Sequence, residues 1–363
     1  LYMRLPNGYM LRDGDMFSSK NAKNREIYWK QPQTMLLCYA YLNDPVLKGE
    51  FEREGGLPDD PVLYLLLNDP SIRPVMQPSH LPLSKDFGKV LGGMLARTGW
   101  NNTPASDDVV AEVKGGGYLF GNHQHSDAGA IQLYYHGMQL GDIGLYLSYG
   151  SPYDYNFNKR SVAHSMMLAY DPKEKLYYRA KTNDGGTRFS QRFPVSPEQT
   201  LNDPWFNGGA VLSAAAGPDP VRPLFSYFKA ELSPAYSAKL SSYTRSFCFL
   251  HLNNPNVPAV IILADAMETA SPNIKQYWQV NAFNRPDMAG SKIMLHSSEA
   301  GVTGYTAVDM LLPKPADREM SILGGDSSRN VFGTYYAVDT SWPESRAYRI
   351  MISPRERNRK QHY

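Results

Sequence analysis

The sequence contains little cysteine, no long apolar run and almost no net charge. Only Cys38 and Cys248 occur among 363 residues, so no disulfide framework can be inferred, although one pair stays open and the redox compartment is undecided. No apolar run approaches the length of a membrane span. The 37 basic and 35 acidic residues leave a formal charge of +2, which gives no global field for nucleic acid or a membrane surface. We therefore expect neither as a partner.

Motifs of several common enzyme classes are also missing. The run Gly115-Gly116-Gly117 is not followed by Lys and Ser or Thr, so it does not predict a phosphate-binding loop. There is no Gly-x-Ser-x-Gly elbow and no Cys-x-x-Cys pair. The chain begins at Leu1 without a charged n-region or an apolar h-region, inside a motif-like stretch. We interpret it as a fragment of a longer protein.

Tyrosine is abundant. The chain has 25 tyrosines, and aromatic residues make up 12% of it. Such a content is typical of a surface that stacks on sugar rings. Tyrosine also fills half-buried strand positions, and composition alone favours that interpretation.

The residue pattern changes along the chain from helix-like to strand-like. The first hundred residues predict helices over 32–42 and 61–67, broken by Pro, Gly and Asp, and in the first of these apolar side chains recur at i, i+1, i+4 and i+7. From about Leu91, short β-branched or alternating runs between turn residues indicate antiparallel sheets. The predicted strands are 109–113, 130–136, 143–149, 162–170, 176–180, 245–251, 260–264, 275–280 and 293–297. Nine such runs favour a sandwich or stacked sheets in an α+β fold.

This organisation predicts three domains. Residues 1–105 would be the end of a helical domain with a linker, residues 106–300 a central antiparallel β domain with a metal site, and residues 301–363 further strands or the start of another β domain. The segment 184–223 is rich in Gly, Asn, Asp, Pro and Ser, so we expect long surface loops there. The basic tail 355–363 is expected to fray in solvent.

The densest polar chemistry lies between Gly121 and Asp127. If this segment is extended, His123 and His125 lie on one face, roughly 7 Å apart. His123 suits acid/base work, because an imidazole titrates near neutral pH and a nearby cation would keep it able to accept a proton. Asn122 could donate a hydrogen bond to a substrate carboxylate or enolate, or simply occupy a turn.

His125, Asp142 and His164 fit a three-ligand zinc site. Zinc draws on imidazole and carboxylate ligands, and each of these residues lies at a predicted strand. His164 could instead be a core histidine and Asp142 a turn residue. Each residue alone is weak evidence for a metal, whereas the three together are stronger.

A tyrosine cluster follows the predicted metal ligands. Tyr146, Tyr149, Tyr153 and Tyr155, with Lys159 and Arg160 behind them, predict contacts with an anionic sugar. A tyrosine hydroxyl can protonate a leaving alkoxide, and arginine can hold a carboxylate or sulfate through two hydrogen bonds. An ordinary hairpin loop enriched in tyrosine is the alternative for most of these positions.

Taken in order, several stretches resemble the heparinase II/III family of polysaccharide lyases, with the heparinase II branch as the closest match. Any single stretch is unspecific, whereas the ordered set is specific and covers residues from about 1 to 300. The matching stretches are Arg97-Thr98-Gly99-Trp100, Gly121 to Gly129, Gly141 to Tyr146, Arg160 to His164, Arg245-Ser246-Phe247, Ile261 to Asp265 and Lys275 to Val280.

The resemblance implies an N-terminal α/α toroid followed by antiparallel β-sheet domains of β-sandwich type, with only the end of the toroid present here. It implies a catalytic role for His123, a role for Asn122 at the uronate carboxylate, and a zinc, thought to be structural, on the three metal ligands. The spacing after Asp142 differs from the family pattern. The family's tyrosine acid and a second histidine come from the toroid upstream of this chain, so an upstream toroid segment or chain would complete the site.

Together these expectations predict a polysaccharide lyase that cleaves a 1,4-linked uronic-acid-containing glycan, similar to heparin or heparan sulfate, by β-elimination. The alternatives are a non-catalytic carbohydrate-binding β-module and a zinc-dependent hydrolase. The resemblance also implies a periplasmic or secreted protein that degrades glycosaminoglycans and binds an anionic polysaccharide. A homodimer is a further expectation.

Overall fold

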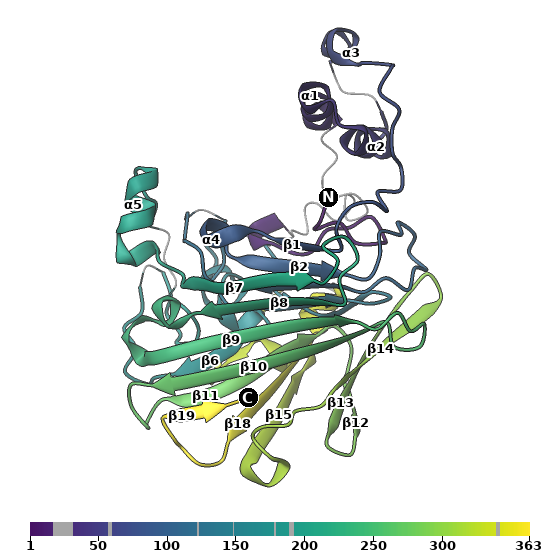
Figure 1. The fold of residues 1–363 in the computed structure, drawn as a ribbon. Helices are drawn as coiled ribbons and strands as arrows, with labels where there is room; N and C mark the ends of the chain where they lie inside the picture. Colours follow the sequence, from purple (N-terminus) through teal and green to yellow (C-terminus); the bar gives the residue numbers. More distant parts are fainter. Residues whose placement is uncertain are drawn as a thin grey trace.

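Antiparallel β-sheets dominate the structure, a computed structural model (Figure 1). It describes residues 1–16, 32–56, 60–121, 123–147, 149–177, 179–188, 192–338 and 342–363. All of the strand pairs in this described part are antiparallel, and the strands form stacked sheets with a shared core. The predicted antiparallel β architecture is therefore confirmed. The predicted domain boundaries stay predictions.

The first sheet has the order β1-β2-β3-β4-β5 and carries the loops of the candidate site. Its second strand is buried on both faces, because Met94 and Ala96 contact the main core while Leu95 faces a small core with Leu5 and Leu11 from the N-terminal segment. The strands are β1 (Ser84–Asp86), β2 (Gly93–Arg97), β3 (Val110–Lys114), β4 (Ile131–Tyr134) and β5 (Met138–Leu140).

Two further sheets pack around the main core, with the orders β19-β10-β9-β8-β7 and β15-β18-β11-β6. Alternation along β9 buries one face, with Phe247 and Phe249 inward, and these side chains join Trp278 and Ile350 from the other sheet. The strands are β6 (Met167–Tyr170), β7 (Ala210–Gly217), β8 (Phe225–Glu231), β9 (Leu240–His251), β10 (Ala259–Thr269), β11 (Lys275–Ala282), β15 (Arg318–Gly324), β18 (Tyr348–Pro354) and β19 (Lys360–His362).

Smaller elements complete the β region. A three-stranded sheet joins β12 (Asp287–Ala289), β13 (Lys292–Glu299) and β14 (Val302–Val308), and β16 (Asn330–Val331) pairs with β17 (Thr334–Tyr335). The remaining short helices are η1 (Gly14–Met16), α4 (Gly88–Leu91), η3 (Asp154–Asn158), η4 (Ser161–Ala163), α5 (Pro197–Asn202), η5 (Pro204–Phe206), η6 (Ser233–Lys239), η7 (Pro315–Asp317), η8 (Gly325–Arg329) and η9 (Pro343–Arg346).

Three helices stand apart from the sheets, next to the N-terminus in Figure 1. They are α1 (Pro32–Leu42), α2 (Pro45–Arg53) and α3 (Pro61–Leu67), so both predicted helices are confirmed. Each begins with proline, and aspartates cap α2 and α3 by accepting backbone N–H groups. The described helices do not form a toroid, and none of them is long and apolar enough to cross a membrane.

Two predicted strands are wrong, and a third, 162–170, is a strand only over β6, because its first residues belong to η4. The described residues of 143–149 form an irregular segment in which the N–H of Ile143 donates to the carbonyl of Ala163 (N···O 2.9 Å) instead of to a strand partner. Its apolar residues Ile143 and Leu145 pack in a second core cluster, so their alternation reflects burial without a sheet. The described residues of 176–180 form no strand either.

Two loop predictions also need correction. The segment 184–223, expected as surface loops, contains α5 and the eight-residue strand β7. The tail 355–363, expected to fray, forms β19, which pairs with β10, and the main-chain groups of Tyr363 and Asp265 exchange two hydrogen bonds of 2.9 Å. A basic edge strand is physically reasonable, because exposed charges protect a sheet edge from pairing with other chains.

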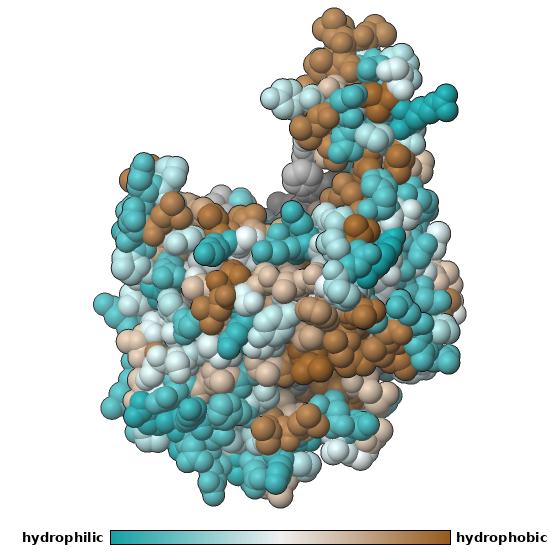
Figure 2. Space-filling view, in the orientation of Figure 1, coloured by the Kyte–Doolittle hydropathy of each residue, from teal (hydrophilic) through white to brown (hydrophobic). Residues whose placement is uncertain are grey.

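Figure 2 shows an apolar patch over the sheet that contains β7 to β10. Phe225, Val260 and Ile262 are exposed on these strands. Alternation on β10 places Val260 and Ile262 on the outer face, opposite the main core.

Candidate functional site

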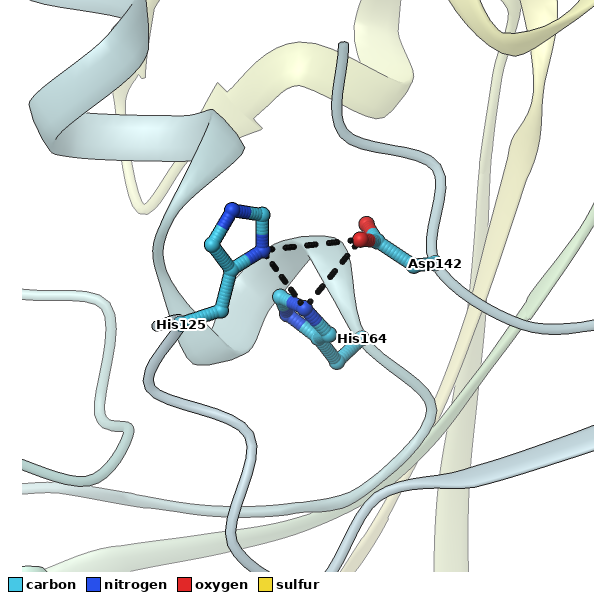
Figure 3. A group of neighbouring side chains, drawn as sticks. All are labelled: His125, Asp142 and His164. Atoms are coloured by element: carbon cyan, nitrogen blue, oxygen red, sulfur yellow. Dashed lines mark hydrogen bonds and ion pairs between the residues drawn. The ribbon is translucent and has the colours of Figure 1, made fainter. Parts of the chain in front are cut away.

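Three buried side chains meet beside the first sheet: His125, Asp142 and His164 (Figure 3). His125 lies between β3 and β4, Asp142 follows β5, and His164 follows η4 just before β6. One ligand atom from each residue lies within 4.8 Å of the ligand atoms of the other two. The predicted metal ligands are therefore brought together in space.

The contacts among the three residues are close. His125 Nδ1 lies 3.2 Å from His164 Nε2, and the carboxylate Oδ2 of Asp142 lies 3.5 Å and 3.3 Å from these two nitrogens. Two imidazoles and a carboxylate form a donor set that suits zinc and other divalent transition metals.

Outer hydrogen bonds assign the tautomers of both rings. His164 Nδ1 donates to the carbonyl of Arg160 (2.9 Å), so its Nε2 keeps a lone pair. His125 Nε2 donates to Asp15 Oδ1 (3.1 Å), so its Nδ1 keeps one. Asp142 Oδ1 accepts the N–H of Gly144 (2.7 Å), which leaves Oδ2 facing the two nitrogens. Three lone pairs therefore converge, with the supporting contacts typical of metal ligands.

Burial and neighbouring charges shift the pKa values of these residues in opposite directions. Burial lowers the pKa of His125, but Asp142 and Asp15 outweigh burial and raise it to about 9. Burial raises the pKa of Asp142, but His164 and His125 hold it well below its usual range. The converging lone pairs thus attract a positive charge, which either a proton or a divalent cation can supply.

His123 faces away from the buried ligands. Its side chain is 58% exposed, whereas that of His125 is 1% exposed. The backbone of His123 has φ +67°, in the left-handed region, which breaks the alternation of an extended strand. The expected placement of both histidines on one face is therefore wrong. The turn directs the imidazole of His123 outward and that of His125 inward.

Asp15 links these two histidines and was not among the predicted site residues. Its Oδ2 accepts hydrogen bonds from His123 Nδ1 (2.9 Å) and Lys159 Nζ (2.6 Å). Burial raises the pKa of Asp15, but His125 and Lys159 outweigh burial and lower it, so the carboxylate is ionised. The Asp-Gly-Asp pattern at residues 13–15 is the only local signal that points to this segment.

Tyr146 and Tyr149 lie on the exposed side of the site. The ring centroid of Tyr146 is 6.2 Å from that of His123 in an edge-on arrangement. Lys159 Nζ lies 5.0 Å from the ring centroid of Tyr146 and 5.5 Å from that of Tyr149, and Tyr149 is 56% exposed. Substrate contact stays a prediction for both tyrosines.

Tyr153, Tyr155 and Arg160 are buried. The hydroxyl of Tyr153 accepts the N–H of Leu145 (3.2 Å), and the guanidinium of Arg160 is paired with Asp184. These contacts disfavour direct binding of a glycan by the three residues. The contacts instead favour a structural role, in which these residues support the loop behind the site. Asn122, predicted to act on a carboxylate, lies outside the described residues.

A cleft of about 520 Å³ opens beside His123, a volume common for ligand sites. The molecule is hollowed between α5 and the helices α1–α3 (Figure 2). Near the cleft, Arg188 Cζ lies 5.5 Å from the ring centroid of Trp205, and neither residue was a predicted site residue. Residues that line the cleft include Glu112, Lys114, Tyr118, Phe120, His123, Asp127 and Arg188.

Comparisons with known proteins show a heparinase-like fold. No protein-family model and no curated protein matches the chain. Two solved structures of a gene product described as heparinase III match at TM-scores of 0.53 and 0.54 and 12% identity, and they cover 99% of this chain and 43% of theirs. Another heparinase III structure matches at a TM-score of 0.55 and 14% identity, covering 99% and 46%.

Identities this low show a shared fold alone. The chain spans less than half the length of these solved structures. The similarity supports the predicted heparinase-like fold and does not favour a particular member, including the heparinase II branch.

Proposed function

We propose that the chain forms part of a polysaccharide lyase that cleaves a 1,4-linked uronic-acid-containing glycan by β-elimination. The observation that carries this proposal is an exposed imidazole, His123, at a cleft and beside a buried three-ligand set. The heparinase III neighbours support the fold such a lyase would have. β-Elimination needs a base for the C5 proton, donors at the carboxylate and an acid for the leaving C4 oxygen.

His123 takes the role of base or acid/base in this proposal, because its ring is accessible while Asp15 holds it from behind. Asn122 neutralises the uronate carboxylate, which makes the C5 proton more acidic. Tyr146 and Tyr149 form the substrate-facing wall next to His123. An upstream toroid segment or chain supplies the tyrosine that protonates the leaving oxygen.

His125, Asp142 and His164 would hold a zinc ion in a structural role. When bound, zinc would cross-link three loops, accept the converging lone pairs and offset the negative charge of Asp142. The burial of all three ligands supports this role over hydrolysis, which requires a coordination position open to substrate. The loop that carries His123 continues directly into His125, so a fixed metal site also fixes the base.

The proposed substrate is an anionic polysaccharide such as heparin or heparan sulfate, and the proposed location is periplasmic or secreted. Arg188, which lines the cleft, and Trp205 beside it suit such a substrate, because arginine binds sulfate or carboxylate and an indole can stack on a sugar ring. A homodimer is a further proposal, for which the apolar patch over β7 to β10 offers a surface.

The test is His123→Ala in the full-length protein, with His80→Ala as the matched control because His80 is exposed outside the site. Unsaturated product is followed by its ultraviolet absorbance on a panel of uronate glycans. We expect His123→Ala to slow the reaction by about 10²- to 10⁴-fold, while the control keeps its rate.

Other results would contradict the proposal. Saturated products from the wild type would favour a hydrolase. Binding without any product would favour a carbohydrate-binding module. An unchanged rate in His123→Ala would remove this imidazole from the mechanism.

A further inference from the structure

A single carboxylate lies between the two histidines of the site. Asp15 Oδ2 is 2.9 Å from His123 Nδ1, and Asp15 Oδ1 is 3.1 Å from His125 Nε2. The side chain of Asp15 is 2% exposed. One buried group therefore contacts both the proposed base and a proposed metal ligand.

The surroundings of Asp15 consist of hydrogen-bond donors. Lys159 Nζ donates to Oδ2 (2.6 Å), and Asn158 Nδ2 approaches Oδ1 (3.5 Å). A carboxylate that faces a buried ammonium group is ionised, and an ionised carboxylate only accepts hydrogen bonds. The two imidazole nitrogens that face Asp15 must therefore both carry a hydrogen.

These constraints act on the two rings in opposite senses. The neutral form of His123 carries its hydrogen on Nδ1, which faces Asp15, so its lone pair is on Nε2, on the exposed side of the ring. His125 carries a hydrogen on Nε2, so its Nδ1 is the nitrogen that faces Asp142 and His164 and that a metal would bind in place of a proton. A neutral imidazole has a lone pair on only one nitrogen, so the tautomer decides which nitrogen can accept a proton or bind a metal.

We infer that Asp15 is a positioning residue that fixes opposite tautomers of His123 and His125 and so prepares one ring to accept a proton and the other to bind the metal. This inference rests on the proposed function for the role of the Nε2 lone pair of His123. Asp15 touches no reacting atom and acts through the two rings.

The backbone before Asp15 is built to hold it there. The Asp15 N–H donates to the carbonyl of His123 (3.0 Å), so the two segments are joined through main chain as well as side chain. Gly14 has φ +54°, and a Cβ on it would lie 2.1 Å from the carbonyl oxygen of His123. Any larger residue at position 14 must push the Asp15 segment away from the histidine.

The first variant is Asp15→Asn. An amide has one accepting oxygen and one donating nitrogen, so it cannot accept from both rings, and at least one imidazole must change its tautomer or lose its partner. We expect kcat to fall by about 10²- to 10⁴-fold, with KM within about threefold of wild type, because substrate contacts remain. Ring ¹⁵N chemical shifts, read in the same variant, report the tautomer of each histidine.

The second variant is Gly14→Ala, which keeps the carboxylate but displaces it. Like Asp15→Asn, this variant is expected to change the ring ¹⁵N shifts and to lower kcat. The matched control is Asp107→Asn, because Asp107 pairs with His136 (2.9 Å) away from the site. This control makes the same chemical change at another aspartate–histidine pair and is expected to leave kcat unchanged.

The ¹⁵N spectrum of the wild-type protein keeps the inference testable even if neither variant folds. A wild-type His123 with its hydrogen on Nε2 overturns the inference, as does an Asp15→Asn variant with wild-type tautomers and kcat within threefold. If the wild type shows the assigned tautomers but cleaves no uronate glycan, the proposed function fails while the positioning role of Asp15 stands.

Discussion

Glu112 offers the sharpest test of the electrostatics around the cleft. This carboxyl group on β3 is buried, and Gln132 Nε2 donates to its Oε2 (2.7 Å). Burial raises the pKa of Glu112 from 4.5 to about 7, although Lys114 nearby acts in the opposite direction. Burial therefore outweighs the ammonium group, and the fold favours the protonated carboxyl.

The sign and size of the effect follow from linkage. A pKa raised in the folded state means that the folded protein binds the proton more tightly than the unfolded chain. The resulting stability is fully present below pH 4.5 and is lost as pH rises to about 7. The difference between the two pKa values corresponds to about 3 kcal/mol, at about 1.4 kcal/mol per pKa unit. Glu112→Gln imitates the neutral carboxyl and should escape this loss.

The assay is urea unfolding of wild type and Glu112→Gln between pH 4 and pH 8. We expect the free energy of unfolding of the variant, minus that of wild type, to rise by about 3 kcal/mol across this range, because the other titrating groups cancel. Glu268→Gln is the control, since Glu268 forms a partly exposed pair with Arg359, and such pairs contribute little. A difference for Glu112→Gln that stays constant with pH would refute the reasoning.

Two further predictions concern a buried ion pair and the metal set. Arg245→Met should lower the free energy of unfolding by about 3 to 5 kcal/mol in urea titrations, because Arg245 Nε and Nη2 each lie 2.7 Å from a carboxylate oxygen of buried Asp265. Adding Asp265→Leu should recover part of this loss, and a loss below about 1 kcal/mol would contradict the prediction. His164→Ala should reduce zinc content after dialysis from about one ion per chain to nearly none, while His80→Ala retains it, and undiminished zinc in His164→Ala would exclude the site.

The fold could be predicted where local pattern and tertiary structure agree. Helices over 32–42 and 61–67 follow from proline at the first turn and periodic apolar residues. The strand predicted over 143–149 failed because Ile143 and Leu145 alternate in order to reach a core from an irregular segment. The tail 355–363 was mispredicted because its backbone partner, β10, lies about ninety residues earlier in the chain.

The candidate site was predictable in its residue types and less so in its geometry. The metal set His125, Asp142 and His164 was selected from the chemistry of three residue types near strands. The opposite orientations of His123 and His125 depend on one positive φ angle, which no residue pattern shows for a histidine. Asp15 was missed because its contact with His123 spans 108 positions in the sequence.

That separation has a consequence for the order in which the protein matures. Contacts between distant segments require the closure of a long loop, so they tend to form after local structure. The segment of Gly14 and Asp15 docks on the main chain of His123, which itself lies between strands of the first sheet. The sheets can therefore assemble before the imidazole is correctly set. During refolding of the full-length protein, activity should therefore return later than the signal from secondary structure.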